Sequence, residues 1–254
     1  MTLRVMITGA SSGIGRALAV EYARRGATLG LIARRSDALQ RVAAEVSVPA
    51  AIYSLDVRDA AGLARAARDF IGQFGVPDVV VANAGVSAGT LTERAEDTAV
   101  LQEIFDINVI GLANTFRPFV AAMRGASHGT LVGIASVAGF RGLPGSGAYS
   151  ASKAAAITYL ESLRLELRGT GVSVVTICPG YIATPMTARN PYAMPFILPA
   201  AVVAPRMVNA IERRKRFAVI PWQMGLVGAV LKMLPRPLYD ALFERAPRKP
   251  RREV

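Results

Sequence analysis

Short, continuously apolar runs alternate along the chain with longer stretches of helical periodicity, and this alternation limits the fold more than any other feature. Strands that are apolar on both faces are typical of a parallel sheet covered by helices on both sides. The strand-like runs cover residues 5–8, 28–33, 51–55, 78–82, 130–135, 172–177 and 217–220. The helical stretches between them cover residues 14–25, 37–46, 60–74, 98–123, 149–168 and 200–213. This order predicts a single α/β domain with a doubly wound, seven-stranded parallel sheet.

A glycine-rich turn joins the first strand-like run to the first helical stretch, with the sequence Thr8-Gly9-Ala10-Ser11-Ser12-Gly13-Ile14-Gly15. Glycines allow the backbone to turn tightly and to approach a diphosphate, which then binds the N–H groups at the start of the helix. The spacing Gly-x3-Gly-x-Gly differs from the usual dinucleotide fingerprint, and taken alone it would also fit a simple strand-to-helix turn. The candidate cofactor-binding residues of this turn are Gly9, Ser11, Ser12, Gly13, Ile14 and Gly15.

Two further motifs accompany the glycine turn. Asn83-Ala84-Gly85 follows the fourth strand-like run, and Tyr149-Ser-Ala-Ser-Lys153 lies on a predicted helix. Together the three motifs resemble those of the short-chain dehydrogenase/reductase family, over at least residues 3–221. The resemblance implies a Rossmann fold and transfer of a hydride between a nicotinamide cofactor and a carbonyl or alcohol compound. The part of the chain after residue 221 is similar to that of hydroxysteroid dehydrogenases and ketosphinganine reductases.

Tyr149 and Lys153 share one face of their predicted helix, since residues four apart adjoin across a turn. A phenol with a pKa of about 10 is a poor base at neutral pH, but a neighbouring ammonium favours its phenolate. Tyr149 is therefore a candidate general acid or base. The resemblance implies that Ser136 binds the substrate oxygen, that Lys153 also binds the nicotinamide ribose, and that Asn108 holds a water in a proton relay.

Each of these four residues also has an ordinary structural explanation. A Tyr–Lys pair at helical spacing is more often part of an amphipathic surface, a serine that ends a strand can cap a turn, and Asn108 can be a structural residue of its helix. The combination of all four with the glycine turn is what indicates catalysis. It also argues against a second interpretation, a dinucleotide-sensing binding protein without turnover.

The end of the second strand-like run bears on the choice of cofactor. Enzymes of this kind that prefer NAD place an Asp there, which binds the adenosine ribose and repels a 2′-phosphate. This sequence has Ala33 followed by Arg34, and a guanidinium binds phosphate through two hydrogen bonds, so NADP(H) is predicted rather than NAD(H). The alternative is a solvated arginine pair, and Arg35 either assists or faces water. The resemblance adds cofactor contacts at Asp56, Val57, Asn83, Ala84, Gly85, Pro179, Gly180, Ile182 and Thr184.

Residues 181–198 form a predicted loop in which prolines are mixed with large apolar side chains, including Met186, Met194 and Phe196. An apolar loop above the cofactor would line the substrate pocket, and adaptable methionines favour a hydrophobic carbonyl or alcohol substrate. Burial of this loop against a partner subunit is the alternative interpretation.

The chain contains one cysteine, Cys178, and one histidine, His128. These counts exclude an internal disulfide, a Cys-rich zinc site and a multi-histidine metal centre, so no metal is predicted. The first residues lack a secretory-signal pattern, and no run approaches the ~18 apolar residues of a membrane span. We therefore expect a cytoplasmic protein, and the absence of a recognition helix or interleaved aromatic residues argues against nucleic acid as a partner.

Positive charge and apolar residues gather near the C-terminal end. The formal net charge is +12, and residues 206–254 hold 12 Lys and Arg against four Asp and Glu. Residues 222–234 are apolar but too few to span a bilayer, which needs about 20. Residues 222–254 are predicted to extend the domain of residues 1–221 and to contact either anionic lipid headgroups or a partner subunit, with 246–254 as a frayed tail. Helices 98–123 and 149–168 resemble those through which relatives pair, which predicts a homodimer or homotetramer.

Overall fold

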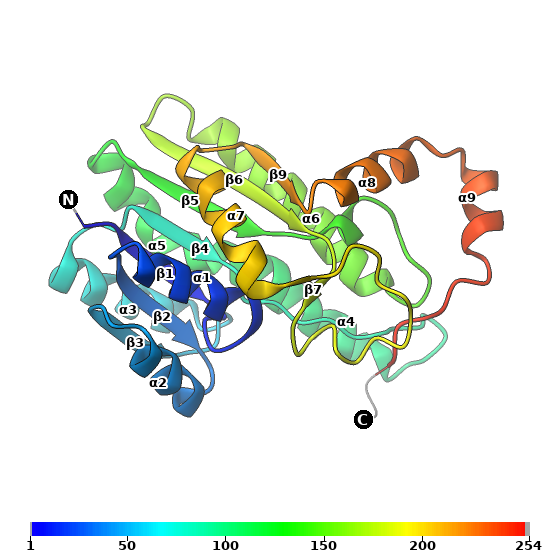
Figure 1. Ribbon diagram of the computed structural model, residues 1–254, viewed down its shortest axis with the longest axis horizontal. Coiled ribbons are helices and arrows are strands. Elements are labelled where there is room, and N and C mark those ends of the chain that lie inside the picture. The colour runs from blue at the N-terminus through cyan, green and yellow to red at the C-terminus, as the bar shows by residue number, and fades with distance from the viewer. Residues whose placement is uncertain (1, 252–254) are drawn as a thin grey trace.

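Seven parallel strands form the centre of the structure, a computed structural model that describes residues 2–251 (Figure 1). The strand order across the sheet is β3-β2-β1-β4-β5-β6-β9. The strands are β1 (Arg4–Thr8), β2 (Thr28–Ala33), β3 (Ala50–Ser54), β4 (Val79–Ala82), β5 (Gly129–Ile134), β6 (Val172–Pro179) and β9 (Phe217–Ile220). The order reverses direction between β1 and β4, as in a doubly wound sheet, and the predicted fold class is confirmed.

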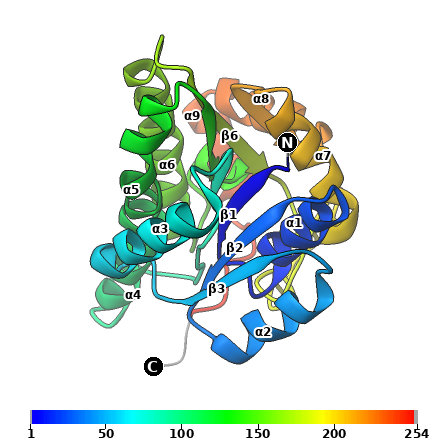
Figure 2. The same ribbon diagram turned by 90° about the vertical axis from the view of Figure 1, so that its left-hand side faces the viewer.

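Helices cover both faces of the sheet (Figure 2). One layer consists of α1 (Gly13–Arg24), α2 (Ser36–Glu45) and α7 (Ala200–Glu212). The other consists of α3 (Ala60–Phe74), α4 (Asp97–Phe105), α5 (Gly111–Gly125) and α6 (Gly147–Glu166). Two buried apolar clusters fill the spaces between the sheet and these layers, which explains why the strands are apolar on both faces.

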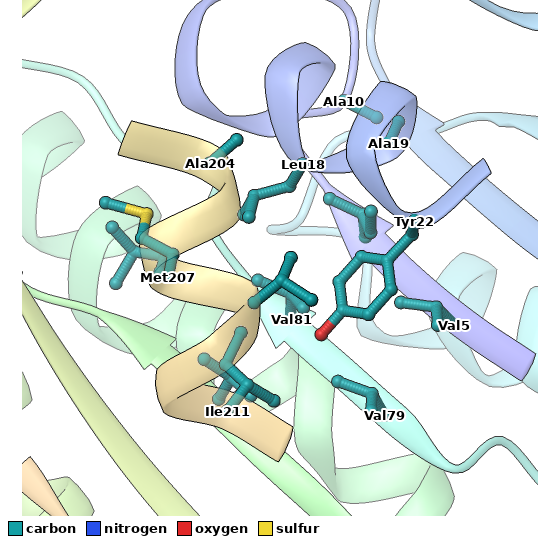
Figure 3. Close-up of a cluster of buried hydrophobic side chains, with 14 of the residues drawn as sticks. Val5, Ala10, Leu18, Ala19, Tyr22, Val79, Val81, Ala204, Met207 and Ile211 are labelled. Atoms are coloured by element: carbon teal, nitrogen blue, oxygen red, sulfur yellow. The ribbon is translucent and has the colours of Figure 1, made fainter. Parts of the chain in front are cut away.

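The first cluster fixes the position of α1, the helix that follows the glycine turn. Figure 3 shows Leu18 and Tyr22 of α1 facing Met207 and Ile211 of α7 above Val81 of β4. All five side chains are almost completely buried. Burying one such side chain stabilises a fold by roughly 1.5–3 kcal/mol, so this contact fixes α1 against the sheet and α7.

The helix predicted over residues 98–123 is interrupted at its middle. A π-helical turn, Asp106–Ile110, connects α4 to α5. A π turn opens the hydrogen-bonding pattern from i→i+4 to i→i+5, and such turns often occur at functional sites. Asn108 lies in this turn and is buried there. The hydrophobic periodicity that predicted one continuous helix does not distinguish this local change.

The chain after β9 forms two further helices, α8 (Gln223–Met233) and α9 (Arg236–Phe243). The Arg141 guanidinium donates hydrogen bonds to the carbonyl oxygens of Leu231 (2.8 Å) and Leu234 (3.0 Å), at the end of α8. The Tyr239 hydroxyl of α9 donates to the Gly142 carbonyl. Both helices are therefore attached to the segment that follows β5. None of the helices within residues 2–251 is both long enough and apolar enough to cross a membrane.

The predicted frayed tail is wrong for the part of it that the structure describes. The backbone N–H of Gly89 donates a 2.8 Å hydrogen bond to the Pro250 carbonyl, and Arg251 forms ion pairs with Glu96 and Asp97. These contacts return the chain from α9 to the start of α4, as Figure 1 shows. Sequence position and charge alone favoured a solvated tail, whereas residues far away in the sequence, Gly89, Glu96 and Asp97, bind it. Residues 252–254 lie outside the described part of the chain.

Candidate active site

A cavity of 320 Å³ lies at the carboxyl ends of the strands, where doubly wound sheets bind ligands. Most of the site residues predicted from the sequence line it: Gly9, Ser11, Ser12, Gly13, Ile14, Arg34, Asp56, Val57, Asn83, Ala84, Gly85, Ser136, Tyr149, Lys153, Pro179, Gly180, Ile182 and Thr184. Gly15 and Asn108 are not part of the lining. The structure thus brings together residues that are up to 175 positions apart in the sequence, from Gly9 to Thr184.

The glycine turn is held against the end of β4 by a small hydrogen-bond network. The Thr8 hydroxyl accepts hydrogen bonds from the backbone N–H groups of Asn83 (3.1 Å) and Ala84 (3.2 Å). In return, the Asn83 side-chain amide donates to the Thr8 carbonyl at 2.9 Å. The motif Asn83-Ala84-Gly85 therefore supports the turn as well as lining the cavity.

Two glycines of the turn are required by close approach of other groups. Gly9 has a positive φ of 67°, and a Cβ there would lie 2.8 Å from the Asn83 side-chain nitrogen. A Cβ on Gly15 would lie 2.3 Å from the Gly9 carbonyl oxygen. Gly15 thus allows α1 to pack directly on the turn, which explains its place outside the cavity lining.

The start of α1 has the features of an anion-binding site. Ser12 precedes the helix in an extended conformation, and its side chain does not cap the helix. The N–H groups of a first helical turn have no acceptor within the helix, and together with the helix dipole they favour a negatively charged ligand. Ser11, Ser12, Gly13 and Ile14 line the cavity at this point, so a diphosphate fits the residues that are present.

Two arginines lie beside the glycine turn after β2. The Arg34 guanidinium is 3.9 Å from the Asp56 carboxylate and is more than half exposed. Arg35 donates a 3.4 Å hydrogen bond to the Ser11 hydroxyl, and both arginines line the cavity. Arg58 binds the Asp56 carboxylate through two hydrogen bonds and lowers its pKa. The sequence left the orientation of Arg35 open, and the structure turns it toward the glycine turn.

Ser136, Tyr149 and Lys153 meet at the end of the cavity next to β5. The Lys153 ammonium donates a 2.9 Å hydrogen bond to the Ile134 carbonyl and lies 5.9 Å from the centre of the Tyr149 ring. Burial lowers the pKa of Lys153 to about 8. Burial also raises the pKa of Tyr149, and a hydrogen bond between the Ser136 and Tyr149 side chains opposes that rise. The tyrosine therefore has both a hydrogen-bonding hydroxyl and a cation beside it.

Asn108 lies behind this group rather than in the cavity. Its side-chain oxygen accepts a 2.9 Å hydrogen bond from the Val86 N–H, and its amide nitrogen donates to the Val86 carbonyl and the Ser152 hydroxyl, each at 3.0 Å. These contacts connect the π turn to the end of β4 and to α6, the helix that carries Tyr149 and Lys153. They fix the position of the catalytic candidates, while the relay role remains a prediction.

Several lining residues were not predicted from the sequence. They are mostly apolar and come from strand ends and neighbouring segments: Leu55, Val86, Ile107, Ile134 and Ala135. No local motif identifies them, since only the folded sheet places them at one edge. Pro185, Met186 and Thr187 also line the cavity, and they belong to the loop of residues 181–198 that was predicted to line the substrate pocket. Lys249, which is not part of this lining, was not predicted either, although its ammonium lies 5.2 Å from the centre of the Tyr149 ring. Within residues 2–251, no three His, Cys, Asp or Glu side chains are grouped so as to bind a metal ion.

The fold and the cavity together define an α/β oxidoreductase that binds a nicotinamide dinucleotide at the carboxyl edge of a parallel sheet. A sequence model of the family described as short chain dehydrogenase matches residues 4–194. The chain belongs to this family, and it is an oxidoreductase that acts on CH–OH groups with NAD(P).

Individual relatives agree with this assignment. A protein of Myxococcus xanthus named as an oxidoreductase is 41% identical over 243 residues, which cover 94% of this chain and 96% of the relative. A short-chain dehydrogenase/reductase from Burkholderia phymatum, solved in complex with NAD, is 26% identical with a TM-score of 0.82 and covers 100% of this chain and 98% of its own. An alcohol dehydrogenase from Thermococcus sibiricus, solved with 5-hydroxy-NADP, is 27% identical with a TM-score of 0.76, over 87% of this chain and 95% of its own.

Proposed function

We propose that this protein is an NADP-dependent oxidoreductase that interconverts a ketone or aldehyde and an alcohol on a hydrophobic substrate. The observation that carries the proposal is the placement of Tyr149 between Ser136 and Lys153 in a cavity that also contains Arg34 and Arg35. Ala33 stands where a carboxylate would repel a 2′-phosphate, and two guanidinium groups lie close by, so NADP(H) is favoured over NAD(H).

Each part of the cofactor has residues suited to hold it. The glycine turn and the start of α1 would bind the diphosphate, and Arg34 with Arg35 would bind the 2′-phosphate. Asp56 and Val57 would contact the adenine, while Asn83, Ala84 and Gly85 would support the adenosine side. Lys153 and Tyr149 would bind the nicotinamide ribose. Pro179, Gly180, Ile182 and Thr184, at and after the end of β6, would contact the carboxamide. When bound, the cofactor supplies or accepts the hydride.

The protein then has to manage one proton and the charge on the substrate oxygen. Ser136 donates a hydrogen bond to that oxygen and orients the carbonyl carbon. Tyr149 gives its phenolic proton to the oxygen during reduction and removes a proton from the alcohol during oxidation. An ammonium close to a phenol favours the phenolate, and this is the role proposed for Lys153 after reduction. The hydrogen bond with Ser136 opposes the effect of burial on the Tyr149 pKa.

The loop after β6 supports a hydrophobic substrate. It contains the short strands β7 (Ile182–Ala183) and β8 (Leu198–Pro199), which pair with each other and connect the end of β6 to α7. Met186 lines the cavity, and Met186, Phe196 and Ile197 are each more than a third exposed. Apolar side chains that are exposed beside a cavity are suited to bind apolar parts of a ligand.

Replacing Tyr149 by Phe tests the catalytic proposal, because the change removes the hydroxyl and keeps the ring. We expect the rate of NADPH oxidation with a panel of ketones, from small to steroid-sized, to fall by about 10²–10⁴-fold. NADPH affinity, measured by fluorescence titration, should change less than about threefold. Tyr53→Phe, in the edge strand β3 and outside the cavity lining, is the control and should keep full activity.

The same experiment separates the enzyme from a dinucleotide-sensing binding protein. A binding protein would take up NADPH with the same affinity in both forms but would reduce no ketone of the panel. Residual activity above about a tenth in Tyr149→Phe would show that another group transfers the proton.

The proposal includes an oligomer in a cytoplasmic setting. Apolar side chains are exposed on α4, the π turn and α6, namely Leu101, Ile110, Tyr159 and Leu165. Such a surface suits an isologous interface, in which the same patch serves both subunits, and it supports a homodimer or homotetramer. Sedimentation velocity at micromolar concentration measures the mass, and a monomer would contradict the proposal.

We propose that residues 222–254 extend the Rossmann domain of residues 1–221 and do not form a separate domain. Their apolar surface, on α8 and α9, is proposed to contact anionic membrane headgroups peripherally, and coverage by a partner subunit is the alternative.

A further inference from the structure

The end of the chain passes directly beside the proposed catalytic tyrosine. The Lys249 ammonium lies 5.2 Å from the centre of the Tyr149 ring, on a segment that returns from α9 to the start of α4 (Figure 1). Lys249 is therefore as close to this ring as Lys153, which lies 5.9 Å from it. The two cations are far apart in the sequence, since Lys153 belongs to α6 and Lys249 to the segment after α9.

Backbone and side-chain contacts hold this segment in place. Arg251 donates hydrogen bonds of 2.8 and 3.0 Å to the two oxygens of Asp97 and one of 2.7 Å to Glu96. Asp97 is only 3% exposed, so this pairing is a partly desolvated, bidentate contact of the strong kind. Pro250 accepts the hydrogen bond from Gly89. Lys249 thus directly precedes two anchored residues and does not lie on a free end.

Lys249 differs from its neighbours in having no anionic partner. Within residues 2–251, no carboxylate forms an ion pair with its ammonium and no acceptor hydrogen-bonds it, whereas Arg251 two positions later contacts two carboxylates. Its side chain is half-buried, and burial lowers its pKa. Removing an ammonium from water is unfavourable unless an opposite charge compensates it, so this place favours a negatively charged group.

We propose that Lys249 is a substrate-binding residue that pairs with a carboxylate, so that the substrate is an apolar carbonyl or alcohol compound bearing one acidic group. The proposal rests on the proposed function, since it places the reacting carbon at Tyr149. The apolar loop after β6 would bind the hydrocarbon part and the tail would bind the acid. Arg251 is a positioning residue that acts through the tail.

Methyl-ketone acids of six, eight and ten carbons, each compared with its methyl ester, are the probes. With the unmodified protein and NADPH, we expect at least one acid to be reduced with a kcat/KM about tenfold or more above that of its ester. Lys249→Gln should remove this preference by raising the KM of the acid and leave the ester within about threefold. Lys249→Arg should retain the preference, and Lys215→Gln, an exposed lysine just before β9 and outside the cavity lining, is the matched control.

Arg251→Gln should reduce the preference for the acid in the same direction, because the tail loses its bonds to Asp97 while Lys249 keeps its charge. Calorimetric binding of the acid and of the ester, in the presence of NADP⁺, separates this proposal from the proposed function. Selective binding of the acid that is lost in Lys249→Gln supports the proposal even where no turnover occurs. Equal binding of the acid and the ester overturns the proposal. A kcat that falls equally for the acid and the ester in Lys249→Gln also overturns it, because Lys249 would then act on Tyr149 and not on the substrate's acidic group.

Discussion

Arg34 and Arg35 are adjacent in the sequence, yet they have different neighbours in the cavity. Arg34 faces Asp56, and Arg35 faces the Ser11 hydroxyl of the glycine turn. The sequence predicted a phosphate contact at Arg34 and left Arg35 either assisting or facing water. Because both arginines line the cavity, we propose that both contact the 2′-phosphate.

Replacing Arg34 by Ala should therefore weaken NADPH binding and leave NADH binding nearly unchanged, because only NADPH carries the 2′-phosphate. Loss of one charge-assisted contact costs on the order of 1.5–3 kcal/mol, or roughly 10- to 150-fold in Kd. Arg35→Ala should act in the same direction. Arg41→Ala, an exposed arginine of α2 that pairs with Asp37, is the control. Equal affinity of the unmodified protein for NADPH and NADH would contradict the assignment.

The protonation of Lys153 provides a pH test. Its pKa of about 8 lies below the ordinary lysine value, so above about pH 8 the free protein loses the charge that would bind the nicotinamide ribose. Since binding favours the charged form, NADPH affinity should fall as the pH rises from 7 to 9.5, by at most about tenfold per pH unit. Lys153→Met should bind weakly at both pH values, with no such dependence. A flat profile for the unmodified protein would show that Lys153 stays charged or does not contact the cofactor.

At the scale of secondary-structure elements, the packing of α1 on the glycine turn depends on the absence of one methyl group. A Cβ on Gly15 would approach the Gly9 carbonyl to 2.3 Å, and because the obstacle is backbone, the helix itself would have to move. A Cβ on Gly72 of α3 meets nothing within 4 Å. The two glycines both lie inside helices and form a matched pair.

Gly15→Ala should lower the melting temperature by several degrees and weaken NADPH binding, since overpacking costs about 1–3 kcal/mol and displaces the anion-binding turn. Gly72→Ala should leave binding unchanged and stabilise the fold by about 0.5–1 kcal/mol, because Ala is the better helix former. Thermal denaturation and NADPH titration measure both effects. An unchanged Gly15→Ala protein would mean that α1 can shift away from the turn without cost.

Some elements and site residues were predicted accurately from the sequence, and others were not. All seven strands of the sheet lie within two residues of their predicted ends, because buried parallel strands carry a continuous apolar signal. Ser136, Tyr149 and Lys153 were predicted because each belongs to a local motif or a strand end. The π turn was not predicted because hydrophobic periodicity does not distinguish it from an α-helix. The contact between Pro250 and Gly89 was not predicted because it joins segments far apart in the chain. Lys249 was missed for the same reason.

At the scale of the whole molecule, the most prominent uncovered surface belongs to α8 and α9. Trp222, Leu226, Val230 and Met233 recur every three or four residues, and each is more than half exposed, with Met233 at 84%. This spacing places the four side chains on one side of α8. Lys232 and Arg236 lie close to this apolar stripe in the sequence, as expected for a helix at a headgroup boundary.

We expect the protein to co-sediment with anionic vesicles at low salt and to be released by high salt, because each basic residue near such a surface contributes about 1 kcal/mol. Leu226→Gln combined with Val230→Gln should weaken binding, and neutral vesicles provide the control for charge. Failure of the protein to co-sediment with anionic vesicles at low salt would rule out the membrane contact. Loss of a dimer in the double variant, measured by sedimentation, would instead assign the stripe to a partner subunit.

The return of the chain to the start of α4 has a practical consequence for how this protein is produced. Only three residues would separate an affinity tag fused after Val254 from Arg251, whose bonds to Glu96 and Asp97 hold Lys249 beside Tyr149. A tag ahead of β1 enters at the amino edge of the sheet, away from the cavity at the carboxyl edge (Figure 1). Purification through the N-terminal end therefore preserves the neighbourhood of the tyrosine, whereas rates measured on a protein tagged at the other end would include the effect of the tag on the tail.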